Sequence, residues 1–133
     1  MIIYFNCKYV FQVIDFSATH GQLLLRSLKT RERGYNIDII LKGVSHIILP
    51  TEFRGIEISI LTNEEKIKFL QNEFDFNIDY DNRIFLIKDT QKKEYFINTF
   101  CFGLYHNELD ILETSIGRYD FENFGELQQW YAD

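Results

Sequence analysis

The sequence predicts an α+β fold: a mainly antiparallel β-sheet, arranged as a barrel- or sandwich-like meander, with one mid-chain helix and a short C-terminal helix. Three observations predict it. Apolar and polar residues alternate at period two, most clearly in "IEISI" (56–60), whose isoleucines share one face. Turn-forming residues separate these short apolar segments, which favours antiparallel pairing over βαβ units. One segment in the middle of the chain has helical spacing instead.

The first half of the chain contains most of the strand signals. Aromatic residues make up 17% of the chain, and such residues suit a pleated, half-buried surface. In "NIDIILK" (36–42) the apolar residues alternate, and Gly43 permits a bend before the next strand. Pro50 ends that strand, because proline cannot donate to a sheet ladder. We therefore expect strands over 1–16, the leucines that follow residue 22, 36–42, 44–49 and 56–60.

The mid-chain helix is predicted over residues 63–74. Thr62 is a suitable N-cap, and Glu65 stands where a capping box needs its acidic partner. The apolar residues of this segment recur at helical spacing and predict the face that packs on the sheet: Ile67, Leu70 and Phe74.

The last third of the chain returns to strand signals and ends in a second predicted helix. We expect strands over 83–89 and 94–106, joined by a hairpin loop. Residues 110–116 are compatible with a further strand or with a connecting segment. In 122–131, Leu127, Trp130 and Tyr131 stand at i, i+3 and i+4, which predicts a short closing helix that docks on the sheet.

The chain of 133 residues predicts a single domain spanning 1–133, since a domain of this length can bury a sizeable core. It contains no apolar run of membrane-spanning length, and its apolar start lacks the basic region and cleavage site of a signal peptide. Cys7 and Cys101 are far apart and are expected to be reduced. These features predict a cytoplasmic protein without a membrane partner and leave the oligomeric state open.

Motifs for catalysis, metals and cofactors are missing from the sequence. His20, His46 and His106 are far apart, and none has a cysteine or carboxylate at zinc-type spacing. The glycines form no phosphate-binding loop, and no serine lies in a G-x-S-x-G context. We therefore assign no catalytic residue, metal or cofactor and expect binding rather than catalysis.

The loop "SATHGQ" (17–22) and the strand after it contain the candidate ligand site. His20, Gln22 and Arg26 could together bind a carboxylate or phosphate group, and Gly21 would allow a close backbone approach. The structural alternative is that His20 satisfies the backbone of the turn while Arg26 pairs with an acid of a neighbouring strand. The loose pattern favours this alternative, because such residues are common in turns.

The net charge of −6 is concentrated at the C-terminal end of the chain. Acidic and basic residues balance over residues 1–103, whereas Arg118 is the only basic residue of 104–133. This distribution disfavours nucleic acid and anionic membranes and would steer a basic protein toward the acidic end. The candidate partner-binding acids are Glu108, Asp110, Glu113, Asp120, Glu122 and Glu126.

Residues 16–61, "FSATHGQLLLRS" and then "NIDIILKGVSHIILPTEFRGIEISI", resemble a group of small uncharacterised bacterial proteins. The shared features are a phenylalanine–polar–histidine loop, a strand and a hydrophobic–Gly–Val step. Some of these proteins look like immunity proteins of bacterial toxin systems. The resemblance implies a compact β-rich scaffold and toxin binding, and it transfers no catalytic residue.

Two functional hypotheses follow. The first is a non-enzymatic binding protein, such as an immunity-type inhibitor that covers a basic bacterial toxin with its acidic C-terminal face. The second is a small ligand-binding domain or enzyme that uses the loop of His20 and Arg26. A flat acidic surface favours the first hypothesis, and a pocket that joins these two side chains favours the second.

Overall fold

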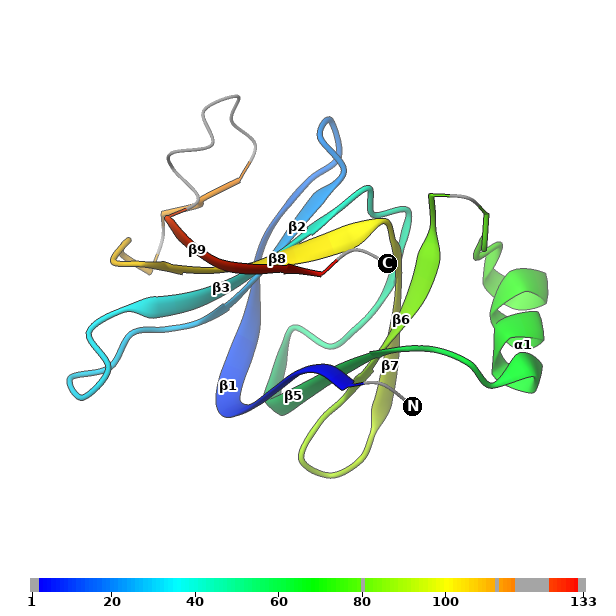
Figure 1. The fold of residues 1–133 in the computed structure, drawn as a ribbon, viewed down its shortest axis with the longest axis horizontal. Coiled ribbons are helices and arrows are strands. Elements are labelled where there is room, and N and C mark those ends of the chain that lie inside the picture. Colours follow the sequence, from blue (N-terminus) through cyan, green and yellow to red (C-terminus); the bar gives the residue numbers. More distant parts are fainter. Residues whose placement is uncertain (1–2, 80, 112, 117–124, 132–133) are drawn as a thin grey trace.

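The computed structural model describes residues 3–79, 81–111, 113–116 and 125–131. Over these residues the chain forms one open sheet of nine strands and one helix, α1, at one end of the sheet (Figure 1). The elements in chain order are β1 (Ile3–Ser17), β2 (Gln22–Ser27), β3 (Asn36–Lys42), β4 (His46–Ile48), β5 (Glu52–Ile60), α1 (Glu64–Phe74), β6 (Arg83–Lys88), β7 (Glu94–Thr99), β8 (Cys101–Asn107) and β9 (Glu126–Tyr131).

The strands pair in the order β4-β7-β6-β5-β1-β2-β3-β8-β9, and every neighbouring pair is antiparallel. The predicted antiparallel sheet is therefore confirmed, but it is one open sheet with β4 and β9 at its edges rather than a closed barrel. The long strand β1 joins the two halves of the sheet: residues 3–12 pair with β5, and residues 12–17 pair with β2. Irregularities in its register, between Cys7 and Val10 and between Val13 and Asp15, mark the bends that such a strand needs.

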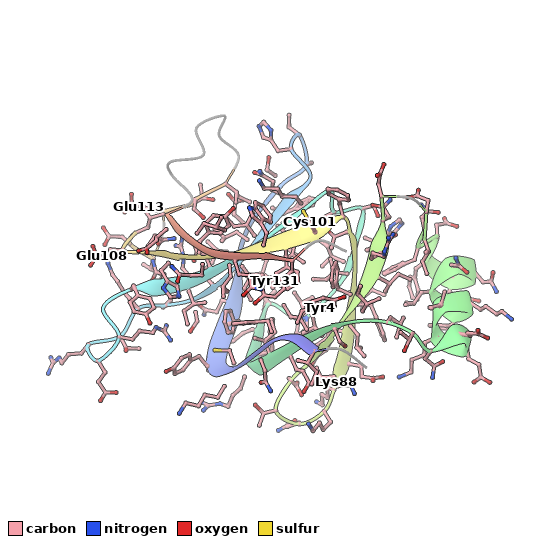
Figure 2. The ribbon with its side chains drawn as sticks, viewed as in Figure 1. Tyr4, Lys88, Cys101, Glu108, Glu113 and Tyr131 are labelled. Carbon is pink, nitrogen blue, oxygen red and sulfur yellow. The ribbon has the colours of Figure 1, made fainter. Side chains whose placement is uncertain are left out.

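The curved sheet encloses one main core on its inner face. Phe85 of β6 meets Phe102 of β8 edge to face, with ring centroids 5.4 Å apart, although the two strands are distant in the sheet order. The ring of Tyr131 of β9 stacks on that of Phe102, with centroids 4.5 Å apart, and meets the Tyr4 ring of β1 edge to face, with centroids 6.1 Å apart (Figure 2). Each large apolar side chain buried in this way contributes about 1.5–3 kcal/mol to stability. The inner core therefore holds the two halves of the sheet together.

Smaller apolar clusters cover part of the outer face of each half of the sheet. On one half, Leu24 of β2 and Ile40 of β3 pack with Tyr105 and Ile116. The segment 108–116, which follows β8, supplies Ile116, and we refer to this segment as the acidic strap. Because the strap covers the outer face, β2 and nearly all of β3 are buried on both sides.

Helix α1 covers the outer face of the other half. It begins one residue later than the sequence indicated, because Asn63 rather than Thr62 is the N-cap: its side chain accepts a hydrogen bond from the Lys66 N–H. Leu70 is buried against β6 and Ile67 is partly buried, as expected. Phe74 was predicted on the same face, but it is 46% exposed. The chain turns at the end of α1, so that the following residue in the apolar cluster is Phe76.

The predicted C-terminal helix (122–131) is wrong over its described residues, because residues 126–131 form strand β9. The spacing of Leu127, Trp130 and Tyr131 suits a helix, but it also suits a strand that has apolar residues on both faces. Tyr131 points to the inner core, whereas Trp130 meets Tyr105 edge to face at 6.0 Å. Residues 122–124 lie outside the described part. Residues 110–111 and 113–116 form a connecting segment rather than a strand.

Candidate functional site

A buried ion pair joins β2 to β3 on the outer face that the acidic strap covers. Arg26 lies opposite Asp38 in the register of the two strands, and both side chains are completely buried. The Arg26 Nε donates to Asp38 Oδ1 at 2.6 Å, and its Nη2 donates to Asp38 Oδ2 at 2.9 Å. This is a bidentate, charge-assisted contact, the geometry in which a guanidinium binds a carboxylate most strongly.

The same ion pair holds the acidic strap in place. The remaining Arg26 nitrogen, Nη1, donates to the Glu113 carbonyl at 2.8 Å and to the Asp110 carbonyl at 3.4 Å. From the opposite side, the Ser115 hydroxyl donates to Asp38 Oδ2 at 3.0 Å. Each partner of the ion pair therefore binds the strap as well as the other partner, and the strap is attached through groups that water does not reach.

Two asparagines fix the start of the strap. The Asn36 Nδ2 donates to Asn107 Oδ1 and to the Leu109 carbonyl, both at 2.8 Å. Asn107 in turn donates to Asp38 Oδ2 at 2.7 Å. In the basic loop before β3, the Lys29 ammonium donates to the Glu108 carbonyl at 2.7 Å. The first two residues of the strap, Glu108 and Leu109, are therefore held by side chains of the loop before β3 and of β3 itself.

The described acids of the strap are exposed, although the Glu113 carboxylate also accepts a hydrogen bond of 2.9 Å from the Asp110 N–H. Glu108, Asp110 and Glu113 are all exposed, and the Asp110 side chain keeps 82% of its accessible surface although Lys29 lies 3.7 Å away. Figure 2 shows Glu108 and Glu113 together at the end of the molecule opposite α1. Glu126 of β9 is exposed as well. Of the predicted partner-binding acids, Asp120 and Glu122 lie outside the described residues.

A groove of about 460 Å³ lies between the strap, β8 and the start of β9, and we refer to it as the Tyr35 groove. Its lining residues are Gly34, Tyr35, His106, Asn107, Glu108 and Glu126. The Tyr35 and His106 rings stack with centroids 4.2 Å apart and an interplanar angle of 27°. Two carboxylates and a pair of stacked rings therefore share one open groove.

The pKa of His106 reflects these surroundings. Burial lowers the pKa of His106 from its usual 6.5, the nearby Glu126 carboxylate raises it, and the Arg33 guanidinium lowers it. The net shift is downward, so the imidazole is mainly neutral at neutral pH. A neutral ring adds no positive charge beside Glu108 and Glu126, and the guanidinium of Arg33 lies 5.9 Å from the centroid of the Tyr35 ring.

Arg33 makes the basic loop beside the Tyr35 groove rigid. Its guanidinium donates to the carbonyls of Tyr35, Ser27 and Leu28 at 3.0, 3.1 and 2.7 Å. It also lies over the Tyr9 ring, 4.4 Å from the centroid. These contacts hold Arg33 next to Tyr35, with the guanidinium 5.9 Å from the centroid of the Tyr35 ring.

The predicted ligand residues are spread along β2 rather than gathered around one cavity. His20 lies in the turn between β1 and β2, Gln22 begins β2 as a buried residue, and Arg26 lies near the other end of the strand. Six residues of extended chain span about 20 Å. Arg26 pairs with an acid of the neighbouring strand, which is the arrangement that the structural alternative expects.

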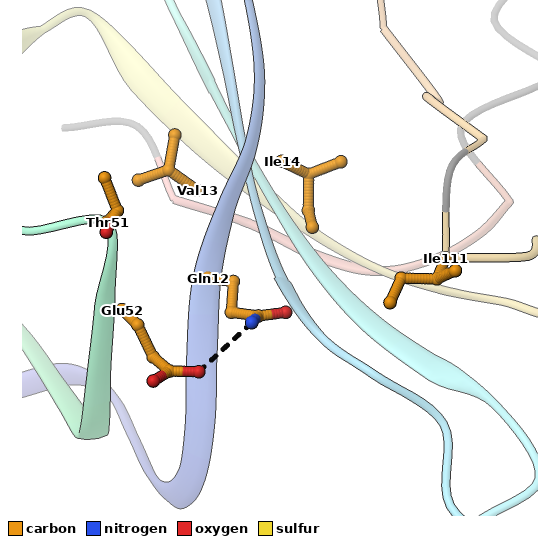
Figure 3. A pocket seen from close by; sticks show the side chains of 6 residues that line it. All are labelled: Gln12, Val13, Ile14, Thr51, Glu52 and Ile111. Carbon is orange, nitrogen blue, oxygen red and sulfur yellow. Dashed lines mark hydrogen bonds between the residues drawn. The ribbon is translucent and has the colours of Figure 1, made fainter.

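A second groove, of about 480 Å³, follows the bend of β1 (Figure 3). Its walls are half polar and half apolar, and a hydrogen bond of 3.1 Å joins Gln12 Nε2 to Glu52 Oε1 across it. The other lining residues are Val13, Ile14, Thr51 and Ile111. These residues include one hydroxyl and one carboxylate, and no histidine, cysteine or lysine to activate a nucleophile.

Among the described residues, no group of three or more histidines, cysteines and acids is arranged to hold a metal ion. Cys7 and Cys101 are free thiols, and burial raises the pKa of Cys101. None of the described helical residues forms a helix long and apolar enough to span a bilayer.

No protein-family model matches the chain, and neither a curated protein nor a solved structure matches it.

Sequence patterns assigned no function to three residues of these sites: Asp38, Asn36 and Tyr35. One signal could have revealed Asp38. Arg26 and Asp38 are charged residues inside two apolar strands that flank the same loop, and each lies six residues from Glu32. A hairpin with its turn centred on residue 32 places them opposite each other. Nothing local marks Asn36 or Tyr35.

Proposed function

We propose that this protein is a non-enzymatic binding module that docks a basic protein partner on the acidic strap and the neighbouring Glu126. The observation that carries the proposal is the attachment of the strap: the buried pair of Arg26 and Asp38 anchors a segment whose own acids face solvent. A segment held only for packing would need apolar contacts such as that of Ile116, and not the exposed carboxylates of Glu108 and Asp110 beside them.

Preorganisation makes such a surface effective. Ordering a loop at the moment of binding costs conformational entropy, about 0.5–1.5 kcal/mol for each immobilised side chain that has many rotamers. The carbonyls of Asp110 and Glu113 are already bound by Arg26, so the strap backbone has little freedom left to lose. Its acids would act as a fixed electrostatic surface that accelerates association with a positively charged protein.

The class of partner that we propose is a basic bacterial toxin, with the chain acting as an immunity-type inhibitor. The resemblance of residues 16–61 to immunity-like proteins supports this class, as does the concentration of the net charge of −6 beyond residue 103. Inhibition by covering a basic surface needs no catalytic group in the inhibitor.

The test compares two charge-reversed variants with equal net charge. The strap variant carries Glu108→Lys, Asp110→Lys and Glu126→Lys. The control carries Glu65→Lys, Glu73→Lys and Asp81→Lys, which are exposed positions on and after α1, at the other end of the sheet (Figure 1). Wild type and both variants are immobilised, partners are captured from a lysate of the source cell, and association with the captured partner is measured at two ionic strengths.

We expect a basic partner that wild type and the control variant capture and the strap variant loses. Its association rate should fall about tenfold or more with strap reversal and should fall with added salt, while dissociation changes little. A partner without net positive charge, or one whose association rate is equal for the strap and control variants, would refute the proposal.

A further inference from the structure

The Tyr35 groove combines two features that together suit one type of side chain. Glu108 reaches it from the start of the strap, and Glu126 reaches it from the start of β9, so negative charge comes from two separate elements. The stacked rings of Tyr35 and His106 lie in the same groove. Cationic groups bind favourably over aromatic rings, and more so when carboxylates lie near.

We propose that the Tyr35 groove binds a single arginine side chain of the partner. The source of this arginine rests on the proposed function, whereas the binding of an arginine side chain to the groove can be tested on its own. The groove of about 460 Å³ has ample volume for a guanidinium and its aliphatic stem.

Arginine matches the groove better than lysine does. Its planar guanidinium can stack on a ring while its N–H groups donate in several directions within the plane, toward both Glu108 and Glu126. The ammonium group of lysine is compact and strongly hydrated, so it would bind one carboxylate while losing more of its hydration. Burial keeps His106 mainly neutral, so its ring does not repel the incoming cation.

The groove is formed before any partner arrives. Glu126 lies opposite His106 in the register of β9 and β8. Gly125 makes this approach possible: its φ is +96°, and a Cβ there would lie 2.5 Å from the His106 carbonyl oxygen. On the other side, the hydrogen bond from Asn36 to the Leu109 carbonyl fixes the chain next to Glu108. Both carboxylates therefore belong to segments whose backbone is anchored.

The probes are short capped pentapeptides, two glycines on each side of a central arginine, lysine or citrulline. Citrulline has nearly the shape of arginine without its charge. Binding is followed by NMR, through the ring signals of Tyr35 and His106. The groove variant carries Glu108→Gln and Glu126→Gln, and the matched control carries Glu65→Gln and Glu73→Gln, which removes equal charge from exposed positions of α1 at the other end of the sheet.

We expect the arginine peptide to shift the signals of both rings and to bind more tightly than the lysine peptide, and the citrulline peptide to cause no shift. The groove variant should weaken arginine binding about tenfold. The control should weaken it less than about twofold, because exposed charges at a distance are screened. Equal binding of citrulline, unshifted rings, or equal weakening in the two variants would overturn the proposal.

The two proposals can fail separately. If the arginine peptide binds the groove but the association rate of the partner is unchanged in the strap variant, the proposed function is refuted and the arginine site stands. If strap reversal slows partner association but the arginine peptide leaves Tyr35 and His106 unshifted, the docking surface stands and the arginine site is refuted.

Discussion

Replacing Arg26 by methionine tests whether the buried ion pair holds the acidic strap. The change would leave the Asp38 carboxylate without its cation in a site that water does not reach, with Asn107 and Ser115 as its remaining donors among the described residues. Breaking a buried ion pair in this way costs about 3–5 kcal/mol. Since small domains are stable by about 5–15 kcal/mol, the loss should be large enough to measure in urea unfolding.

The double variant Arg26→Met with Asp38→Leu separates the buried charge from simple loss of contacts. It removes the unpaired charge, so its cost should be clearly smaller than the sum of the two single changes. The residual cost should be about 1–3 kcal/mol, because the Asn107 amide and the Ser115 hydroxyl lose an acceptor.

Arg26→Lys adds a readout specific to the strap. Lysine keeps the charge but cannot bind both Asp38 oxygens and the Asp110 and Glu113 carbonyls together. We expect Arg26→Lys to accelerate amide hydrogen exchange in the strap relative to wild type. Exchange in β6, which lies in the other half of the sheet, should stay unchanged. A free energy loss below about 1 kcal/mol for Arg26→Met, strictly additive single changes, or unchanged exchange in the strap would refute the role assigned to Arg26.

Three further predictions concern single positions. Gly55→Ala should destabilise the fold by about 1–3 kcal/mol in urea unfolding, because Gly55 has a φ of +78° and its added Cβ would lie 2.3 Å from Thr90 Oγ1. Gly34→Ala is the control, because a Cβ at Gly34 would have no atom within 4 Å. Because folding lowers the pKa of His106, the unfolded chain binds more protons than the folded chain. The contribution of His106 to the free energy of unfolding is therefore fully present above pH 6.5 and is lost as the pH falls through the lowered folded-state pKa. His106→Phe should reduce this decline between pH 7.5 and 5, and an unchanged pH dependence would contradict the role of His106. His20→Ala should change stability by about 0.5 kcal/mol or less, and a loss of several kcal/mol would show a buried, paired histidine.

Local sequence patterns were sufficient for much of the sheet and for α1. The alternation in 56–60 and 36–42 marks β5 and β3, because one face of each strand must be apolar to face the inner core. The helical spacing of Ile67 and Leu70 marks α1 for the same reason. These signals are local, since each residue needs only its own neighbours along the chain to reveal which face is buried.

Local patterns failed where two structures satisfy the same spacing. Residues 126–131 were expected to be helical, but β8 offers them a free edge, and pairing lets Tyr131 reach Phe102 while Trp130 covers Gly103. Phe74 has the spacing of a buried residue, but α1 ends there and the chain buries Phe76 instead. In both cases a partner distant in sequence decides the outcome.

The sequence by itself determined the kind of protein: an antiparallel sheet with a mid-chain helix and an excess of acid at the C-terminal end. Only the tertiary structure decided what Arg26 does and where the acids lie. Arg26 meets carbonyls 84 and 87 residues away in the chain, at Asp110 and Glu113. Such contacts depend on how strands align and which segment covers them, and that alignment is set by burial of the whole core rather than by the residues that make the contact.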